Sequence, residues 1–306
     1  MFRRMVLQRS VEIVEVGPRD GLQNESAAIS TADKLALIER ALGYGVRRIE
    51  VTSFVNPRRV PQMADAEAVV AALPDRDDVT WIGLVLNERG AERALATRID
   101  QLGAVCVATD TFAQRNQGQT SAESVQVAIR IAALARAAGR TAQTTIASAF
   151  GCPFEGEVDP DRIVAMAVAL AEGGMVEIAL ADTIGVAVPA QVAALVARVK
   201  AAIAPLPVRV HLHDTRNTGI ANVWAAVEAG AATIDTALGG LGGCPFAPGA
   251  AGNVATEDAI YLLDRSGVTT GLDLAGASAA SLWLSDIMGK SLPGRLARTG
   301  GFPIAA

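Results

Sequence analysis

Both histidines of this chain of 306 residues lie in one short segment, VHLHDTRNTG, at residues 210–219. His211 and His213 are two residues apart in a run typical of a β-strand, so their side chains point to the same face. Two adjacent imidazoles with a carboxylate nearby are ligands that a divalent cation accepts. The alternative is a structural pair bonded to the backbone. We favour the metal site because the segment holds the whole histidine complement.

Other polar residues that could do chemistry follow further strand-like runs. They are Arg19, Asp20 and Gln23 in GPRDGLQNE, Glu50 and Ser53 in RRIEVTSF, Asp182 in VEIALADT, and Cys244, Asn253 and Glu257 in GGLGGCPFAPGAAGNVATED.

Two of these residues suggest specific roles. Arg19 carries a permanent positive charge that could stabilise an oxyanion or enolate. The alternative is a structural salt bridge from Arg19 to Glu50 or Asp182, which would close this end of the fold. Cys244 lies in a glycine-rich loop, which could deliver a proton donor or acceptor when the loop closes. A buried cysteine in an ordinary glycine-rich turn is the alternative. Cys106 is expected in the core, and Cys152 is left without a role.

Eight runs rich in β-branched residues recur along the chain, separated by alanine-rich segments with helical features. The predicted strands are residues 11–17, 47–54, 80–86, 104–110, 143–150, 176–183, 208–214 and 233–242. Helices are expected at residues 31–45, with Ser30 or Thr31 as N-cap, and at 189–203, which begins with a proline.

Eight strand–helix units in this order predict an α/β fold, a single (β/α)8 TIM barrel. We expect one catalytic domain over residues 1–306, with the barrel at about 11–265 and a short helical extension at about 271–306. A doubly wound sheet is the alternative, but PRDGLQ after the first strand is not its phosphate-binding fingerprint. Active sites of such barrels lie at the C-terminal ends of the strands, where the polar residues above are found.

Composition limits the function further. The chain is 51% hydrophobic and 19% charged, with a net charge of −5, which argues against nucleic acid or acidic membranes as partners. No run of about 18 apolar residues or signal-peptide core is evident. Three separated cysteines without a CxxC pair indicate a reducing compartment, so we expect a cytoplasmic protein.

Five motifs together resemble the 3-hydroxy-3-methylglutaryl-CoA lyase family, from about Val11 to Asp264. They are GPRDGLQNE, IEVTSFVNPRRVPQMADAE, ADTIGVAVP, HLHDT and GLGGCPFAPGAAGNVATED. The resemblance implies a metal-dependent retro-Claisen cleavage of 3-hydroxy-3-methylglutaryl-CoA to acetyl-CoA and acetoacetate. It also implies an acyl-CoA substrate and a homodimer.

The resemblance assigns roles to the candidate residues. Asp20, His211, His213 and Asn253 would ligate Mg²⁺ or Mn²⁺, and less readily Zn²⁺. Arg19 would stabilise the enolate and Cys244 would exchange a proton with its carbon. The base stays open between Glu50, Asp182 and a metal-bound water. The remaining residues would hold ligands and substrate: Gln23, Ser53, Asp182 and Glu257.

Two departures from the family pattern put the acyl group in question. Arg216, Asn217 and Thr218 follow HLHDT where a Tyr-Gly-Gln stretch is expected, and Ala179 stands in place of a serine. They suit either a different tertiary 3-hydroxyacyl-CoA or neutral variation with Arg216 as a helix cap. Arg58 and Arg59 could meet CoA phosphates or face solvent. The other hypotheses are an acetyl-CoA-dependent condensing synthase and a non-catalytic barrel.

Overall fold

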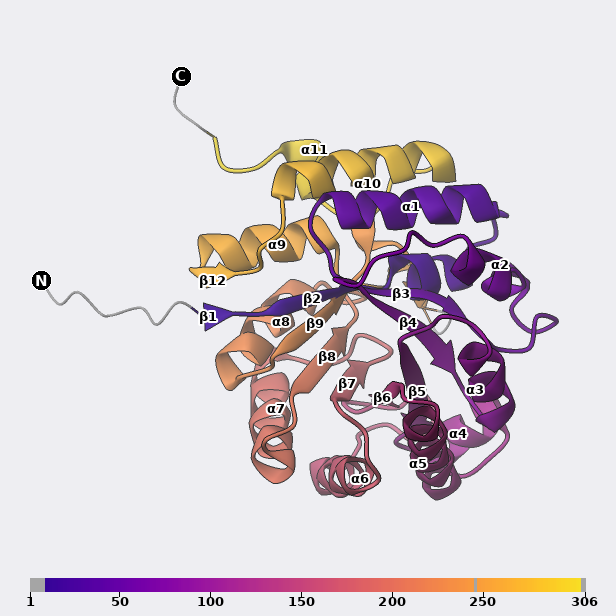
Figure 1. Ribbon diagram of the computed structural model, residues 1–306. Helices are drawn as coiled ribbons and strands as arrows, with labels where there is room; N and C mark the ends of the chain where they lie inside the picture. Colours follow the sequence, from indigo (N-terminus) through magenta and orange to yellow (C-terminus); the bar gives the residue numbers. More distant parts are fainter. Residues whose placement is uncertain (1–8, 245–246, 304–306) are drawn as a thin grey trace, which may run out of the picture.

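The computed structural model describes residues 9–244 and 247–303, and the side chains at 244 and 247–251 lie outside this description. Eight parallel strands close into a barrel in chain order, and the last pairs with the first (Figure 1). The strands are β2 (Glu12–Glu15), β3 (Arg48–Ser53), β4 (Thr80–Val85), β5 (Gln101–Val107), β6 (Thr141–Ala147), β7 (Ile178–Asp182), β8 (Val208–Leu212) and β9 (Thr233–Thr236). The predicted (β/α)8 barrel is confirmed.

Helices surround this barrel and cover its outer face (Figure 1). They are α1 (Thr31–Gly43), α2 (Ala66–Ala71), α3 (Glu88–Leu95), α4 (Asp110–Gln117), α5 (Ser121–Ala137), α6 (Pro160–Glu172), α7 (Pro189–Ile203), α8 (Gly219–Ala229), α9 (Thr256–Arg265), α10 (Leu274–Met288) and α11 (Leu296–Thr299). Ser30 caps α1, as expected, because its side chain accepts a hydrogen bond from the backbone N–H of Asp33. Helix α7 begins at Pro189, also as expected. No described helix is both long and apolar enough to cross a membrane.

Several predicted strands end earlier than expected, and tight turns follow the first and the last of them. The first ends at Glu15, since Gly17–Gly21 forms a π-helical turn in which Gly21 N donates to Val16 O. The last ends at Thr236 and is followed by a 3₁₀ turn at Leu238–Gly240. Gly239 and Gly240 both have positive φ there, which glycine tolerates without a steric penalty. These turns shape the rim of the barrel.

Short strand pairs lie outside the barrel. β1 (Arg9–Ser10) pairs with β12 (Val268–Thr269) in parallel, and β10 (Gly243–Cys244) pairs with β11 (Ala247–Ala251) in antiparallel fashion. The second pair belongs to the glycine-rich segment that follows β9. Its return strand leads directly to Asn253, so this hairpin connects Cys244 with the barrel mouth.

The barrel interior combines a small apolar group with buried charges. Val14, Val16, Ile82 and Ala237 form a separate apolar cluster of buried residues. Toward the N-terminal ends of the strands, Arg48 donates to both oxygens of Glu177 at 3.3 and 2.7 Å. Branched apolar residues usually fill such interiors. This barrel therefore depends on ion pairing as well as on apolar packing.

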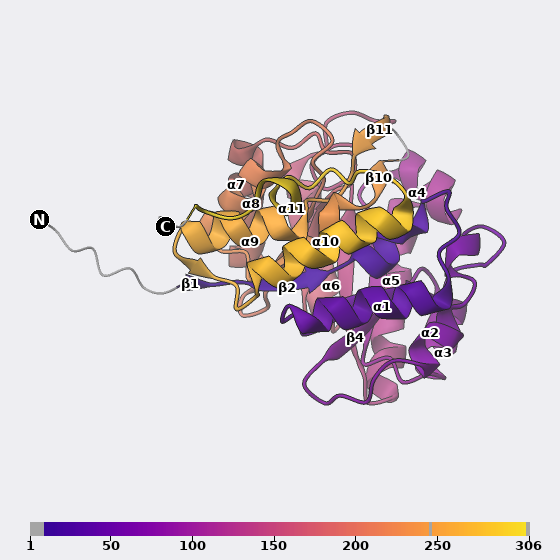
Figure 2. The same cartoon turned by 90° about the horizontal axis from the view of Figure 1, so that it is seen from above.

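The segment after the barrel returns as α10, which lies beside α1 and α9 (Figure 2). Glu257, at the start of α9, holds this packing: one carboxylate oxygen accepts from Ser281 Oγ on α10 at 2.8 Å, and the other accepts from Gly239 N at 3.0 Å. The Glu257 side chain is 0% exposed. Burial raises its pKa to about 7 despite these bonds.

Because the pKa of Glu257 is higher in the folded state than its ordinary value of 4.5, folding favours the protonated carboxyl. The resulting stability is complete below pH 4.5 and is lost as the pH rises through 7. We predict that Glu257→Gln removes this pH dependence. The free energy of unfolding of the variant, relative to that of wild type, should then rise by about 2 kcal/mol between pH 5 and 8, because one pKa unit corresponds to ~1.4 kcal/mol. Urea unfolding at both pH values measures it. Glu39→Gln on the exposed face of α1 is the control, and a wild-type-like pH profile for Glu257→Gln would contradict the assignment.

Candidate metal centre

Three side chains converge at the C-terminal ends of the barrel strands. The Nε2 atoms of His211 and His213 are 3.1 Å apart, and Asp20 Oδ2 is 3.8 Å from His211 Nε2. One potential ligand atom from each of the three lies within 4.8 Å of the others. His211 and His213 are buried, and Asp20 is partly exposed. The structure thus brings together three of the four residues expected to bind a metal.

The strand and turn geometry explains this convergence. His211 belongs to β8, and His213 lies one residue beyond it, where it forms an isolated bridge with Asn253. Two-residue periodicity points both imidazoles inward, as predicted. The π-helical turn after β2 brings Arg19 and Asp20 to the same mouth, although adjacent residues of a regular strand would diverge.

Asn253 joins the cluster through Asp20. Its Nδ2 donates to Asp20 Oδ2 at 2.8 Å and to Leu241 O at 3.1 Å. The fourth expected ligand therefore lies against the cluster, with its amide nitrogen in contact with the carboxylate. Its role as a metal ligand stays a prediction.

Arg19 is held from two sides. Its Nε and Nη2 donate to the two oxygens of Glu50 at 2.7 and 3.1 Å, and its Nη1 donates to Asp20 Oδ1 at 2.5 Å. Of the two ion pairs considered from the sequence, with Glu50 or Asp182, the structure has the one with Glu50, and it coexists with the contact to Asp20. The guanidinium is therefore fixed beside the carboxylate that faces the two histidines.

Burial and charge separate the titration of these groups. Burial opposes ionisation of Asp20, but the charge of Arg19 and then those of the histidines hold the pKa of its carboxyl far below the usual range. Burial, together with the neighbouring His211, lowers the pKa of His213 to about 3. Burial also disfavours charge on His211, yet its hydrogen bond to Asp235 and the charge of Asp20 raise its pKa. At neutral pH the cluster offers an anionic oxygen and a neutral imidazole, as metal ligands require.

The separation of the donor atoms fits a bound cation. Adjacent ligand atoms around a metal with bonds of about 2.0–2.2 Å lie roughly 3 Å apart. The two Nε2 atoms have this spacing. His213 Nδ1 is buried without a hydrogen-bond partner among the described residues, so Nε2 is the ring atom that is directed into the cluster.

The other expected site residues have different surroundings. Both oxygens of Asp182 accept backbone N–H groups, from Val186 at 2.9 Å and Ala187 at 3.0 Å, and burial raises its pKa. Glu257 is wholly buried against α10, which favours a supporting role over the expected substrate contact. The Ser53 hydroxyl is buried without a hydrogen-bond partner in the described structure, and Gln23 is half-buried.

The three cysteines differ in what can be said of them. The backbone of Cys244 lies in β10, but its side chain lies outside the described residues, so its proton-transfer role stays a prediction. Cys106 is in the core, as expected, and burial raises its thiol pKa to about 12. Cys152 is also buried, and its sulfur accepts from Thr109 Oγ1 at 3.0 Å.

Of the two departures from the family pattern, Arg216 follows β8, whereas Ala179 is the second residue of β7 and is wholly buried. Arg216 Nη1 donates to the backbone oxygens of Ile184 at 2.7 Å and Gly185 at 3.0 Å, so it fastens the loop after β7. Ala179 is in register with Thr145 on β6, which is itself in register with Val105 on β5. Val105 and Thr145 are only partly buried although each lies within its strand.

Asp235 on β9 contacts the cluster but was not singled out from the sequence. Its Oδ2 is 3.2 Å from His211 Nδ1. Asp235 is in register with Val14, so its side chain lies on the face that points into the barrel. The sequence signal for it was an aspartate in the strand-like run TIDT, at a position whose side chain points inward. A charged residue at such a position needs a partner.

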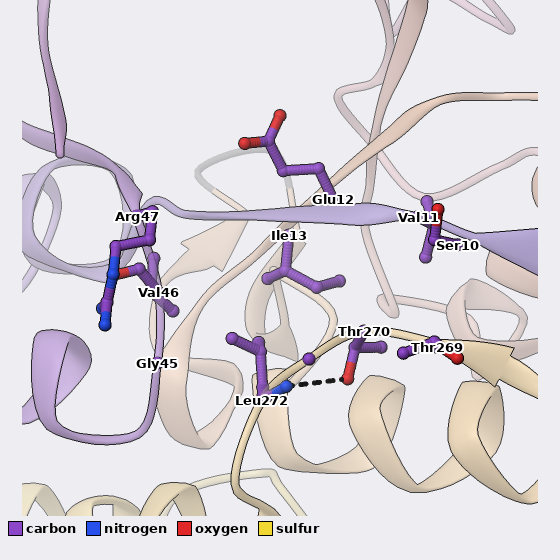
Figure 3. Close-up of a pocket in the computed structure, with 11 residues that line it drawn as sticks. Ser10, Val11, Glu12, Ile13, Gly45, Val46, Arg47, Thr269, Thr270 and Leu272 are labelled. Carbon is purple, nitrogen blue, oxygen red and sulfur yellow. Dashed lines mark hydrogen bonds between the residues drawn. The ribbon is translucent and has the colours of Figure 1, made fainter. Parts of the chain in front are cut away.

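A shallow groove of about 410 Å³ lies at the opposite end of the barrel, between the start of β2 and residues 269–272. Ile13 and Leu272 project toward each other there, and Glu12 points away (Figure 3). The Arg47 guanidinium is bound to the backbone oxygens of Leu42 and Val46. The groove therefore lacks the convergent ligands found at the mouth.

Comparisons with known proteins agree with the geometry. A profile of the HMGL-like family matches residues 10–282. The chain is 46% identical to (R)-citramalyl-CoA lyase of Chloroflexus aurantiacus, and the alignment covers 95% of each protein. It is 38% identical to hydroxymethylglutaryl-CoA lyase YngG of Bacillus subtilis, over 95% of this chain and 97% of that protein. An HMG-CoA lyase from Acinetobacter baumannii, solved with coenzyme A and 3-methylmalate, superposes with a TM-score of 0.92 at 36% identity over 99% of this chain and 100% of that one. The resemblance noted in the motifs is confirmed.

We predict that His213→Ala weakens Mn²⁺ binding by at least about 100-fold, because loss of a direct ligand should exceed the 10–100-fold effect of losing an outer-shell partner. Isothermal titration calorimetry on metal-free protein measures the affinity, and far-UV circular dichroism checks the fold. Asp161→Asn, on the exposed face of α6, is the control. Unchanged Mn²⁺ affinity in a folded His213→Ala variant would remove this residue from the ligand set.

Proposed function

Because the chain belongs to the HMGL-like family and is a carbon–carbon lyase, we propose that it cleaves a tertiary 3-hydroxyacyl-CoA into acetyl-CoA and a keto acid. The observation that carries the proposal is the convergence of Asp20, His211 and His213 beside a fixed Arg19 at the barrel mouth. Retro-Claisen chemistry needs a polarised hydroxyl and a stabilised enolate, and this arrangement suits both.

We assign Asp20, His211, His213 and Asn253 to a resident divalent cation, Mg²⁺ or Mn²⁺ because oxygen and imidazole ligands with open positions suit these ions. When bound, such a cation lowers the pKa of a coordinated hydroxyl and stabilises a developing ketone oxygen. The protein's own part is to hold the four side chains in place before substrate arrives.

Arg19 is assigned to the thioester oxygen. As the hydroxyl proton leaves, the hydroxyl oxygen becomes a ketone and the C2–C3 bond breaks, which leaves its electron pair in the enolate of acetyl-CoA. The Arg19 guanidinium is already fixed by Glu50 and Asp20, so little reorganisation is needed when that negative charge develops. Cys244 is assigned to the following step, in which its thiol donates a proton to the enolate carbon.

Glu50 and Asp182 are better suited to positioning than to taking the hydroxyl proton. Glu50 accepts from Arg19 with both oxygens, and Asp182 accepts two backbone N–H groups of the loop after β7. Both oxygens of each carboxylate already accept hydrogen bonds, so a substrate hydroxyl would have to compete with those donors. A cation held by Asp20, His211, His213 and Asn253 would supply a bound water as the alternative base.

For the acyl group we propose (R)-citramalyl-CoA first and 3-hydroxy-3-methylglutaryl-CoA second. The relative named for the former is 46% identical, whereas two relatives named for the latter are 37% and 38% identical. The two acyl groups differ by one methylene between the hydroxyl carbon and the distal carboxylate. The partly exposed Val105 and Thr145, in register with Ala179, are the proposed wall of the acyl pocket.

We expect acetyl-CoA release from both thioesters in the presence of Mg²⁺ or Mn²⁺, and none with excess EDTA. One methylene in a pocket is worth about 1–3 kcal/mol, so kcat/KM for (R)-citramalyl-CoA should exceed that for the methylglutaryl thioester by roughly 10–200-fold. A coupled assay of acetyl-CoA over a panel of 3-hydroxyacyl-CoAs measures both. The reverse ratio would exchange the two substrates, and no release from any thioester would favour a condensing synthase.

Cys244→Ala should lower kcat by about 10²–10⁴-fold, the range of general acid–base catalysis, with Mn²⁺ affinity unchanged. Cys106→Ala is the matched control, because its thiol is buried in the core. Stopped-flow measurement of acetyl-CoA release, with calorimetry for the metal, separates the two effects. A rate within a few-fold of wild type would exclude Cys244 from proton transfer.

A further inference from the structure

Asp235 connects the candidate metal centre to a second buried charge. On one side its Oδ2 lies 3.2 Å from His211 Nδ1, and on the other its Oδ1 lies 3.1 Å from Arg209 Nε. His211 and Asp235 are register neighbours on β8 and β9, and Arg209 is the preceding inward residue of β8. Asp235 is 3% exposed and Arg209 is 1% exposed. The carboxylate is therefore enclosed between a guanidinium and an imidazole.

Arg209 is itself held by charges that lie toward the N-terminal ends of the strands. Its Nη1 lies 3.6 Å from Glu177 Oε2, and Glu177 accepts from Arg48 and from Thr233 Oγ1. The Arg209 N–H groups are not aligned on these oxygens as hydrogen bonds, so the contacts are ion pairs only. The buried guanidinium thus holds the position of the Asp235 carboxylate through charge, which leaves Oδ2 directed at His211.

This contact decides which imidazole nitrogen of His211 is available. A carboxylate can only accept, so a hydrogen on Nδ1 of His211 points to Asp235. In the neutral imidazole, the lone pair on Nε2 then faces His213 Nε2 and Asp20, 3.1 and 3.8 Å away. Carboxylate partners commonly fix the tautomer and orientation of metal-binding histidines in this way.

We infer that Asp235, held in place by Arg209, is a positioning residue that presents Nε2 of His211 to the divalent cation. The inference rests on the metal site proposed above. Asp235 would not touch substrate, and its loss would act through the orientation and tautomer of His211. Arg209 would act one step further away, on the carboxylate.

Asp235→Asn tests this assignment directly. An amide has one accepting oxygen, so it cannot serve both Arg209 and His211. If the oxygen faces the guanidinium, the NH₂ group faces Nδ1 and the hydrogen of His211 moves to Nε2. We expect Mn²⁺ affinity to fall by about 10–100-fold in calorimetry. In ¹H–¹⁵N correlation spectra of metal-free protein at alkaline pH, His211 should change from the Nδ1–H to the Nε2–H form. The chain has only two histidines, so the two imidazoles are readily distinguished.

Thr236→Val is the matched control, since Thr236 is also buried on β9 but is bonded to Thr256. It should leave both the Mn²⁺ affinity and the tautomer unchanged. Asp235→Asn alone leaves the buried Arg209 guanidinium without its ion-pair partner, which could destabilise the fold. The double variant Asp235→Asn/Arg209→Met removes both charges of the pair, so Mn²⁺ affinity can be measured without an unpaired buried guanidinium.

Wild-type affinity in both Asp235 variants, with His211 still in the Nδ1–H form in Asp235→Asn, would overturn the inference and leave the metal site intact. An equal loss of affinity in Thr236→Val would also overturn it, since the effect would then be a general one on β9. Absence of Mn²⁺ binding by wild type would overturn the metal site itself. None of these measurements depends on the choice of substrate.

Discussion

Pairing of buried charges is the constraint on which this barrel depends. A series of contacts runs along its interior from Arg48 to Glu177, then to Arg209, Asp235 and His211. The interior is shielded from water, so an unpaired charge would cost several kcal/mol and each member must have its neighbour. The series begins near the N-terminal ends of the strands and ends at the mouth. The residues that would do chemistry are thus supported by residues that only pair charges.

The same need to pair buried charges applies at the barrel mouth, where a second group of charged residues reaches the histidines. Asp20 faces the histidines, Arg19 neutralises Asp20, and Glu50 fixes Arg19 through two bonds. An apolar core would tolerate small rearrangements, but a set of alternating charges specifies its geometry closely because every displacement separates opposite charges. This is the condition that electrostatic catalysis requires, since dipoles and charges that are already oriented need little reorganisation when negative charge develops.

Sequence reasoning found what alternation and order along the chain determine. The eight strands, and the shared face of His211 and His213, follow from local pattern. The π-helical turn that brings Arg19 beside Asp20 does not, because an i to i−5 bond leaves no residue pattern. Asp235 was missed because its partner is distant in sequence. Glu257 was expected at the substrate, but tertiary packing against α10 directs its carboxylate to Ser281.

The candidate metal centre and the proposed acyl wall place different demands on their residues. The cluster is built from the turn after β2, the end of β8 and the segment around Asn253, where any change would disturb paired charges. The proposed acyl wall, on β5 and β6, has the half-buried residues Val105 and Thr145, which bear no charge and are in register with the wholly buried Ala179. If these residues line the acyl pocket, substitutions there would alter its size by a methyl group or a hydroxyl, at a cost of about 1–3 kcal/mol. Selectivity between acyl chains that differ by one methylene would then change at this wall while the paired charges of the candidate metal centre stay constant.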